Sequence, residues 1–210
     1  MGLTATDTGG NSNFPPCPTG LHHAVCYAVF DLGTQHNDMF NTDQHKCVIV
    51  WELPNERIEI ERDGIKESMP RAISDQYTVS LSEKSKLRPI LESWRGRGFT
   101  NQELIAFDIF TVLGANCMLN VIHKPKKDGG PKAVISSVTP LPKGIQKLEP
   151  ENEIIYFSFE DGGEIPEATP KWIKDSIMQS REMNEQGQQN DWAYDPPDEP
   201  AIHGDEDIPF

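Results

Sequence analysis

The sequence predicts a mainly β fold, a five-stranded barrel with a helical insertion, and three observations lead to this prediction. Apolar residues alternate with a period of two in three segments of the first 81 residues, which is the pattern of strands. The spacing changes to a helical period between residues 87 and 112. Two further β-rich segments follow, and an Asp-Gly-Gly turn joins them.

The first predicted strand covers residues 22–33. Its even positions, among them Ala24 and Cys26, form an apolar face, whereas its odd positions, among them Tyr27, form a mixed face. The residues before the strand are polar and end in a stretch rich in proline and glycine. Residues 1–20 are therefore predicted to form a flexible N-terminal arm.

The second and third predicted strands cover residues 45–53 and 73–81, with a charged loop or hairpin between them. Pro54 is expected to end the second strand, because proline cannot donate a ladder hydrogen bond. Trp51 and Tyr77 lie on the apolar faces of these strands. Both are predicted to pack in the core.

A helical insertion follows the third strand. Apolar residues recur at helical spacing from Leu87 to Trp94, which predicts a first helix, ended by the glycines that come next, and a core position for Trp94. Thr100 and Glu103 form a capping box. This motif predicts a second helix that ends at Gly114.

The last two strands of the barrel are predicted at residues 116–123 and 132–138, joined by a hairpin turn. Three strands, an insertion and two more strands are the order of an OB-fold, a partly closed barrel that binds oligonucleotides through one sheet face and its loops. An unrelated α+β sandwich gives the same order, so that alternative stays open. We assign the OB-fold domain to residues 21–148.

The remaining chain divides into an extension and a tail. The extension, residues 149–184, contains a predicted strand at residues 154–159 and a helix that begins at Lys171, behind Thr169-Pro170. Residues 185–210 are rich in Gln, Asn, Asp and Pro and contain no basic side chain. They are predicted to form a disordered acidic tail.

The net charge of −14 is distributed unevenly along the 210 residues. Residues 149–210 contain 3 basic and 17 acidic side chains and account for the whole excess. Residues 84–147 contain 11 basic and 4 acidic side chains, a local charge of +7. The low overall pI therefore does not exclude a nucleic-acid-binding surface.

Cysteine spacing and the absence of known motifs argue against several classes of protein. The four cysteines form no Cys-x-x-Cys pair, so we predict buried free thiols and no metal site. They are Cys17, Cys26, Cys47 and Cys117. No phosphate-binding loop, paired-histidine helix or Gly-x-Ser-x-Gly elbow occurs, so we predict neither an enzyme nor a cofactor. No run of about 18 apolar residues and no secretory signal occurs, which predicts a soluble intracellular protein.

The most specific motif is formed by the last six residues. Three carboxylates precede a short apolar tip, which suits a pocket that is hydrophobic inside and basic at its rim. The motif is Asp205-Glu206-Asp207-Ile208-Pro209-Phe210. It resembles the acidic C-terminal tip of bacterial single-stranded DNA-binding proteins. In that family an OB-fold and a disordered linker precede the tip, which recruits replication and repair enzymes.

The body of the chain resembles a different branch of such proteins. Residues 29–35 (VFDLGTQ), 50–54 (VWELP) and 87–97 (LRPILESWRGR) are similar to single-stranded DNA-binding proteins of tailed bacteriophages. The similarity spans roughly residues 20–145. It implies an OB-fold and a role in phage replication, recombination or repair, in the cytoplasm of the host cell. The implied partners are single-stranded DNA and replication or recombination proteins. The resemblance does not fix the oligomeric state, so a homo-oligomer stays open.

Single strands are bound by basic grooves that follow the phosphates and by aromatic side chains on which bases stack. The predicted contacts are basic residues of the +7 segment, a sheet-face pair at positions 27 and 46, and a phenylalanine in a Gly-rich turn. They are Tyr27, Lys46, Lys84, Lys86, Arg88, Arg95, Arg97, Phe99, Lys124, Lys126, Lys127 and Lys132. The sequence thus predicts a non-catalytic protein that coats and protects single-stranded DNA and recruits enzymes through its tip. The alternative is an acidic protein-interaction adaptor, or a DNA mimic without DNA binding of its own.

Overall fold

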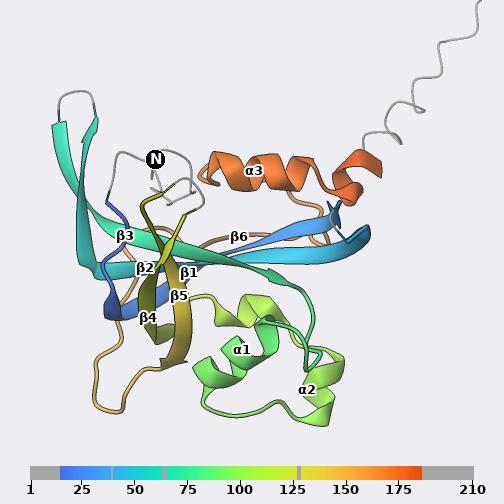
Figure 1. The fold of residues 1–210 in the computed structure, drawn as a ribbon, viewed down its shortest axis with the longest axis horizontal. Coiled ribbons are helices and arrows are strands. Elements are labelled where there is room, and N and C mark those ends of the chain that lie inside the picture. The colour runs from blue at the N-terminus through green and yellow to red at the C-terminus, as the bar shows by residue number, and fades with distance from the viewer. Residues whose placement is uncertain (1–14, 39, 63–64, 127–128, 186–210) are drawn as a thin grey trace, which may run out of the picture.

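The computed structural model describes residues 15–38, 40–62, 65–126 and 129–185. Six strands dominate it (Figure 1). They are β1 (Gly20–Asn37), β2 (Thr42–Arg62), β3 (Ile65–Thr78), β4 (Asn116–Pro125), β5 (Pro131–Pro140) and the short β6 (Ile155–Phe157). The helices are α1 (Leu87–Arg95), α2 (Asn101–Ile105), the 3-10 helix η1 (Ile109–Val112) and α3 (Lys171–Met178).

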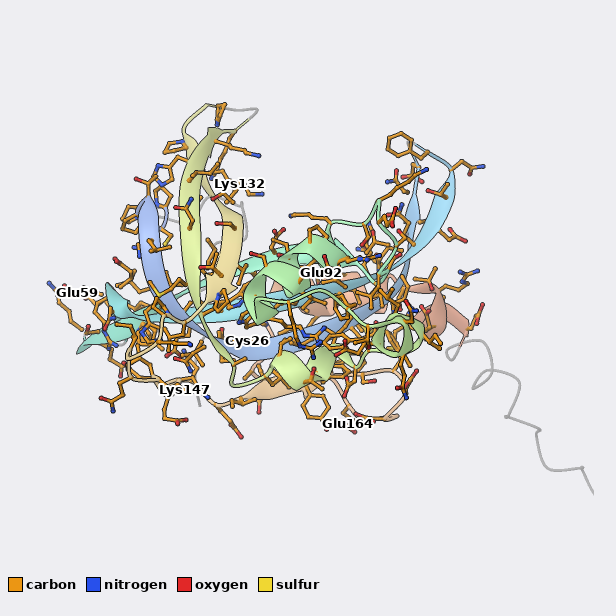
Figure 2. All side chains as sticks on the ribbon, turned by 90° about the horizontal axis from the view of Figure 1, so that it is seen from below. Cys26, Glu59, Glu92, Lys132, Lys147 and Glu164 are labelled. Carbon is orange, nitrogen blue, oxygen red and sulfur yellow. The ribbon has the colours of Figure 1, made fainter. Side chains whose placement is uncertain are left out.

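The strands form one sheet in the order β3-β2-β1-β4-β5, with every neighbouring pair antiparallel and β6 added parallel to β1. The prediction of a mainly β fold with helices between the third and fourth strands is confirmed. Within the described residues β3 pairs only with β2 and β5 only with β4, so the sheet is open between β3 and β5. The β4–β5 hairpin and the far end of the β1–β2 hairpin project to the same side of the molecule (Figure 2).

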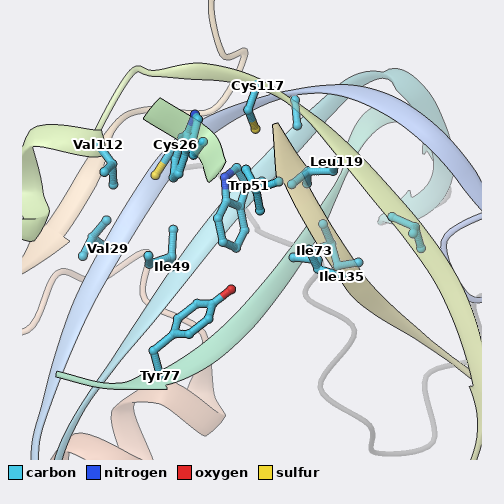
Figure 3. Close-up of a cluster of buried hydrophobic side chains, with 14 of the residues drawn as sticks. Cys26, Val29, Ile49, Trp51, Ile73, Tyr77, Val112, Cys117, Leu119 and Ile135 are labelled. Atoms are coloured by element: carbon cyan, nitrogen blue, oxygen red, sulfur yellow. The ribbon is translucent and has the colours of Figure 1, made fainter. Parts of the chain in front are cut away.

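The inner face of the sheet encloses the first of two hydrophobic clusters. Strands β1 to β5 all contribute to it, and α1 packs against it with Leu91 and Trp94. Trp51 and Tyr77 are 0% and 2% exposed and belong to this cluster (Figure 3), so the core positions predicted for the two residues and for Trp94 are confirmed. The four cysteines are buried free thiols, also as predicted.

The outer face of β1 and β2 carries the second cluster. Along β1 the side chains do not alternate strictly between the two faces. The register of β1 against β2 shifts between Cys26 and Ala28. Cys26 and Val29 consequently face the inner cluster, while Tyr27 and Ala28 face the outer one. Helix α3 and strand β6 cover this outer cluster (Figure 1), and both faces of β1 are therefore buried.

Two carboxylates fix the C-terminal extension to the sheet. The side chain of Glu52, which is fully buried, accepts hydrogen bonds from the backbone N–H groups of Glu151 and Asn152 at 2.8 and 2.9 Å. Glu182 accepts hydrogen bonds from the backbone N–H and the hydroxyl of Thr34 at 2.7 and 2.6 Å. The extension is thus a layer of the folded body.

The predicted ends of the second strand and of the second helix are wrong. Pro54 does not end the second strand: β2 continues to Arg62, and Pro54 lies where the pairing with β3 is interrupted, which is where a strand tolerates proline. The second helix does not reach Gly114 either. The capping box at Thr100 is present, but α2 ends at Ile105 because Ala106 has an extended backbone, and η1 begins separately.

The residues just before β1 contact the open side of the sheet. Cys17 is 3% exposed and belongs to the inner cluster. Its backbone carbonyl accepts a hydrogen bond from His123 on β4 at 2.8 Å. The guanidinium of Arg71 on β3 donates to the backbone carbonyl of Pro15 at 2.7 Å. The end of the predicted arm therefore bridges β4 and β3, while residues 1–14 lie outside the described part.

Candidate nucleic-acid interface

The β4–β5 hairpin concentrates exposed positive charge. Lys124 and Lys132 are exposed and stand directly opposite each other in the register of the two strands. Lys126 follows them at the end of the hairpin and is half-buried. Within the described residues none of these three lysines forms an ion pair, and Lys127 lies outside those residues. Like charges that face each other across two strands are unfavourable, so the hairpin is poised to accept an anion.

The basic side chains of α1 and its flanking residues differ, because carboxylates already neutralise most of them. Arg88 contacts Glu92 at 2.9 Å, and Lys86 contacts Asp75 at 2.5 Å. Both Arg95 and Arg97 contact Glu103. The structure therefore brings these predicted DNA contacts together, but as parts of ion pairs. Lys84 is exposed, and no ion pair of Lys84 occurs within the described residues.

Glu103 organises the turn between α1 and α2. Hydrogen bonds from Arg97 and from the backbone of Thr100 hold the pKa of this carboxyl well below its ordinary value. Arg95, bound to the same carboxylate, lies 4.4 Å from the ring centre of Phe99, whose edge meets Phe107. Phe99, predicted to stack on bases, is thus half-buried and already has two neighbours for its ring.

The two predicted sheet-face contacts lie on the side that α3 covers. Tyr27 is 1% exposed within the outer cluster, so no base can reach its ring in this structure. Lys46 is half-buried on β2, two residues before Val48, which packs in the same cluster. The periodicity of β1 did not reveal that a later segment of the chain covers this face.

The structure adds residues that sequence reasoning missed. Phe40, in the turn between β1 and β2, is 69% exposed. Arg71 and Gln76 of β3 line a cavity of about 200 Å³ together with Lys132 of β5. Arg71 was missed because the third strand was predicted to begin at residue 73. Only the extension of β3 to Ile65 places Arg71 on an edge strand.

A second cavity, of about 730 Å³, has the opposite electrostatic character. Its lining includes Asp31, Asp108, Glu160 and Asp161 together with His45. Asp31 lies 2.6 Å from the imidazole of His45, and this hydrogen bond raises the pKa of His45 above its ordinary value. The excess of carboxylates would repel a phosphate backbone. No group of three or more potential metal ligands occurs within the described ranges.

Comparison with known proteins identifies no relative. No protein-family model, no curated protein sequence and no solved structure matches this chain. In the part of the chain that the structure describes, no helix is long and apolar enough to cross a membrane. The case for a nucleic-acid interface therefore depends on the geometry and the charge of the chain itself.

Proposed function

We propose that this protein binds single-stranded DNA through the side of its sheet that carries the β4–β5 hairpin. The observation that carries the proposal is the facing pair Lys124 and Lys132, two exposed cations without a carboxylate partner among the described residues. A bound phosphate relieves their mutual repulsion, and the counterions released from the strand favour binding. The acidic tip recruits enzymes of DNA replication, recombination or repair, as its sequence indicates.

The arrangement of the hairpins supports a strand-binding role of the OB-fold kind. OB-folds bind oligonucleotides between the loop that joins their first two strands and the loop that joins their last two. In this protein the corresponding hairpins project to the same side (Figure 2). One presents Lys132, and the other presents Phe40 as an exposed ring on which a base can stack.

Fluorescence anisotropy with an oligo-dT strand and the matching duplex, measured over a salt series, tests the proposal. We expect preferential binding of the single strand. The slope of log affinity against log salt should be about −0.7 per phosphate contacted. Equal affinity for strand and duplex, or no binding of either, would contradict it.

Deletion of the tip, residues 205–210, should leave single-strand affinity unchanged or increase it, because the tail carboxylates compete with phosphates for the lysines. Anisotropy with the same oligo-dT measures this. The double variant Ile208→Ala and Phe210→Ala is the matched control, since it keeps every carboxylate and should bind DNA as the full chain does. Weaker DNA binding after deletion would contradict the proposal that the body binds DNA and the tip only recruits enzymes.

The alternative function, an acidic adaptor or DNA mimic, is favoured by one observation, the four carboxylates that line the cavity of about 730 Å³. The function of such a protein does not depend on the hairpin lysines. Charge reversal at Lys124 and Lys132 therefore separates the two functions, because only a DNA-binding protein loses affinity for oligo-dT.

A further inference from the structure

The open space between the edge strands β3 and β5, which we call the seam, contains a cavity of about 200 Å³. Residues 71–76 of β3 line one side, and Lys132 and Ala133 of β5 line the other. Cys17 and Trp172 complete the lining. The cavity exceeds the roughly 30 Å³ that one water molecule occupies in the liquid. It can therefore hold a group of several atoms.

Two residues of the seam lining each carry a buried hydrogen-bond donor without a partner. The side-chain nitrogens Nε of Arg71 and Nε1 of Trp172 are both buried and without a hydrogen-bond partner. A buried donor without an acceptor is unfavourable, so each of these two residues is stabilised when an acceptor reaches it. A second nitrogen of the same guanidinium donates to the backbone carbonyl of Pro15 at 2.7 Å, which holds Arg71 beside the cavity.

The charge of the seam selects an anion as that acceptor. Arg71 and Lys132 are cations, and the one carboxylate in the lining, Asp75, lies 2.5 Å from the ammonium of Lys86. Trp172, which lines the cavity, belongs to the first turn of α3. The positive end of a helix dipole favours negative charge. The first turn of α3 has no side-chain cap that would use this property.

We propose that the seam is a phosphate-binding site, in which Arg71 and Trp172 donate hydrogen bonds to one phosphate of the bound strand and Lys132 supplies charge at the rim. The identity of the ligand rests on the proposed function, whereas the preference for an anion does not. A phosphate fits because its oxygens accept several N–H donors at once, and charge-assisted bonds of this kind are strong. Lys132 also belongs to the hairpin, so the site continues directly into the exposed lysine pair.

The indole N–H signals of the full-length protein in a ¹⁵N NMR spectrum provide a direct test. We expect oligo-dT to shift the Trp172 signal, which Trp172→Phe identifies by its loss, and to leave the signal of Trp51 in the inner core in place. Inorganic phosphate alone should shift the Trp172 signal in the same direction. Arg71→Gln should abolish both shifts.

Binding measurements give a second readout. Arg71→Gln should make the log-log salt dependence of oligo-dT binding shallower by about 0.7, the contribution of one phosphate contact. Arg57→Gln is the matched control: Arg57 is exposed, pairs with Glu151 and lies outside the seam lining, so its loss should leave the slope unchanged. Unchanged melting temperatures of both variants confirm that the fold is intact.

The two proposals can fail separately. Oligo-dT binding with a stationary Trp172 signal and an unchanged slope for Arg71→Gln would overturn the phosphate site and leave the proposed function standing. A shift with inorganic phosphate, but no binding of oligo-dT, would support an anion site and contradict the proposed function. No shift with either ligand would overturn the site.

Discussion

Gly33→Ala is expected to lower the free energy of unfolding by roughly 2–5 kcal/mol, from about 1–2 for a left-handed backbone and about 1–3 for overpacking. Gly33 has φ +66°, and a Cβ atom there would lie 2.6 Å from Oε2 of Glu182 and 2.8 Å from atoms of both Phe159 and Ser180. The substitution would push the extension away from β1 at the point where Glu182 binds Thr34. For a body of this size the melting temperature should fall by about 4–20 °C.

Gly162→Ala is the matched control for this prediction. Gly162 has φ +62°, almost the same backbone conformation, but an added Cβ atom would meet nothing within 4 Å. Gly162→Ala should therefore lower the free energy of unfolding only by the backbone strain, about 1–2 kcal/mol. Thermal denaturation followed by circular dichroism measures both variants. Equal losses of stability would show that the extension does not pack closely on β1.

The double charge reversal Lys124→Glu and Lys132→Glu is expected to weaken oligo-dT binding by up to about 2 kcal/mol, roughly 30-fold, from about 1 kcal/mol for each exposed contact. The salt dependence should become shallower by about 1.4, because two phosphate contacts are lost. Anisotropy over a salt series measures both quantities. The reason is local: the two lysines face each other on the hairpin with no carboxylate partner among the described residues.

Two controls make this result specific. Lys143→Glu and Lys147→Glu change the net charge equally, and Figure 2 shows Lys147 far from Lys132, so this pair should leave affinity nearly unchanged. Lys132→Glu alone creates an opposite-charge pair with Lys124 and should raise the melting temperature slightly while it weakens DNA binding. If both double variants lose affinity equally, the effect is one of net charge and the hairpin is not the site.

The strands and the inner core could be predicted from periodicity because burial there depends on local alternation. The predicted core positions of Trp51 and Tyr77 follow from one apolar face in each strand. The same reasoning failed at Tyr27, because residues more than 120 positions later cover its face of the strand. It also failed after Tyr27, where the register shift reverses the faces of β1. It also failed beyond Ile105, because the cap of a helix is a local signal but its end was set by the extended backbone at Ala106.

Only part of the candidate site could be predicted from the sequence. The lysine cluster at the β4–β5 turn is a local feature, and composition alone identified it. The neutralisation of Arg95 and Arg97 by Glu103 was not foreseen, although all three residues are close in the sequence. The seam could not be predicted from the sequence, because Arg71 and Trp172 are brought together only by the folding of the extension onto the sheet.

Photocrosslinking of an oligo-dT strand to the full chain, with the adducts located by mass spectrometry, shows where the strand lies on the protein. We expect adducts on the β4–β5 hairpin, on residues 71–76 of β3 and at Phe40. Tyr156 is an internal control, since it is 49% exposed but lines the acidic cavity, and it should remain unmodified. Adducts concentrated at Tyr156 or on the exposed side of α3, with none on the hairpin, would show that the strand does not bind on the hairpin side of the sheet.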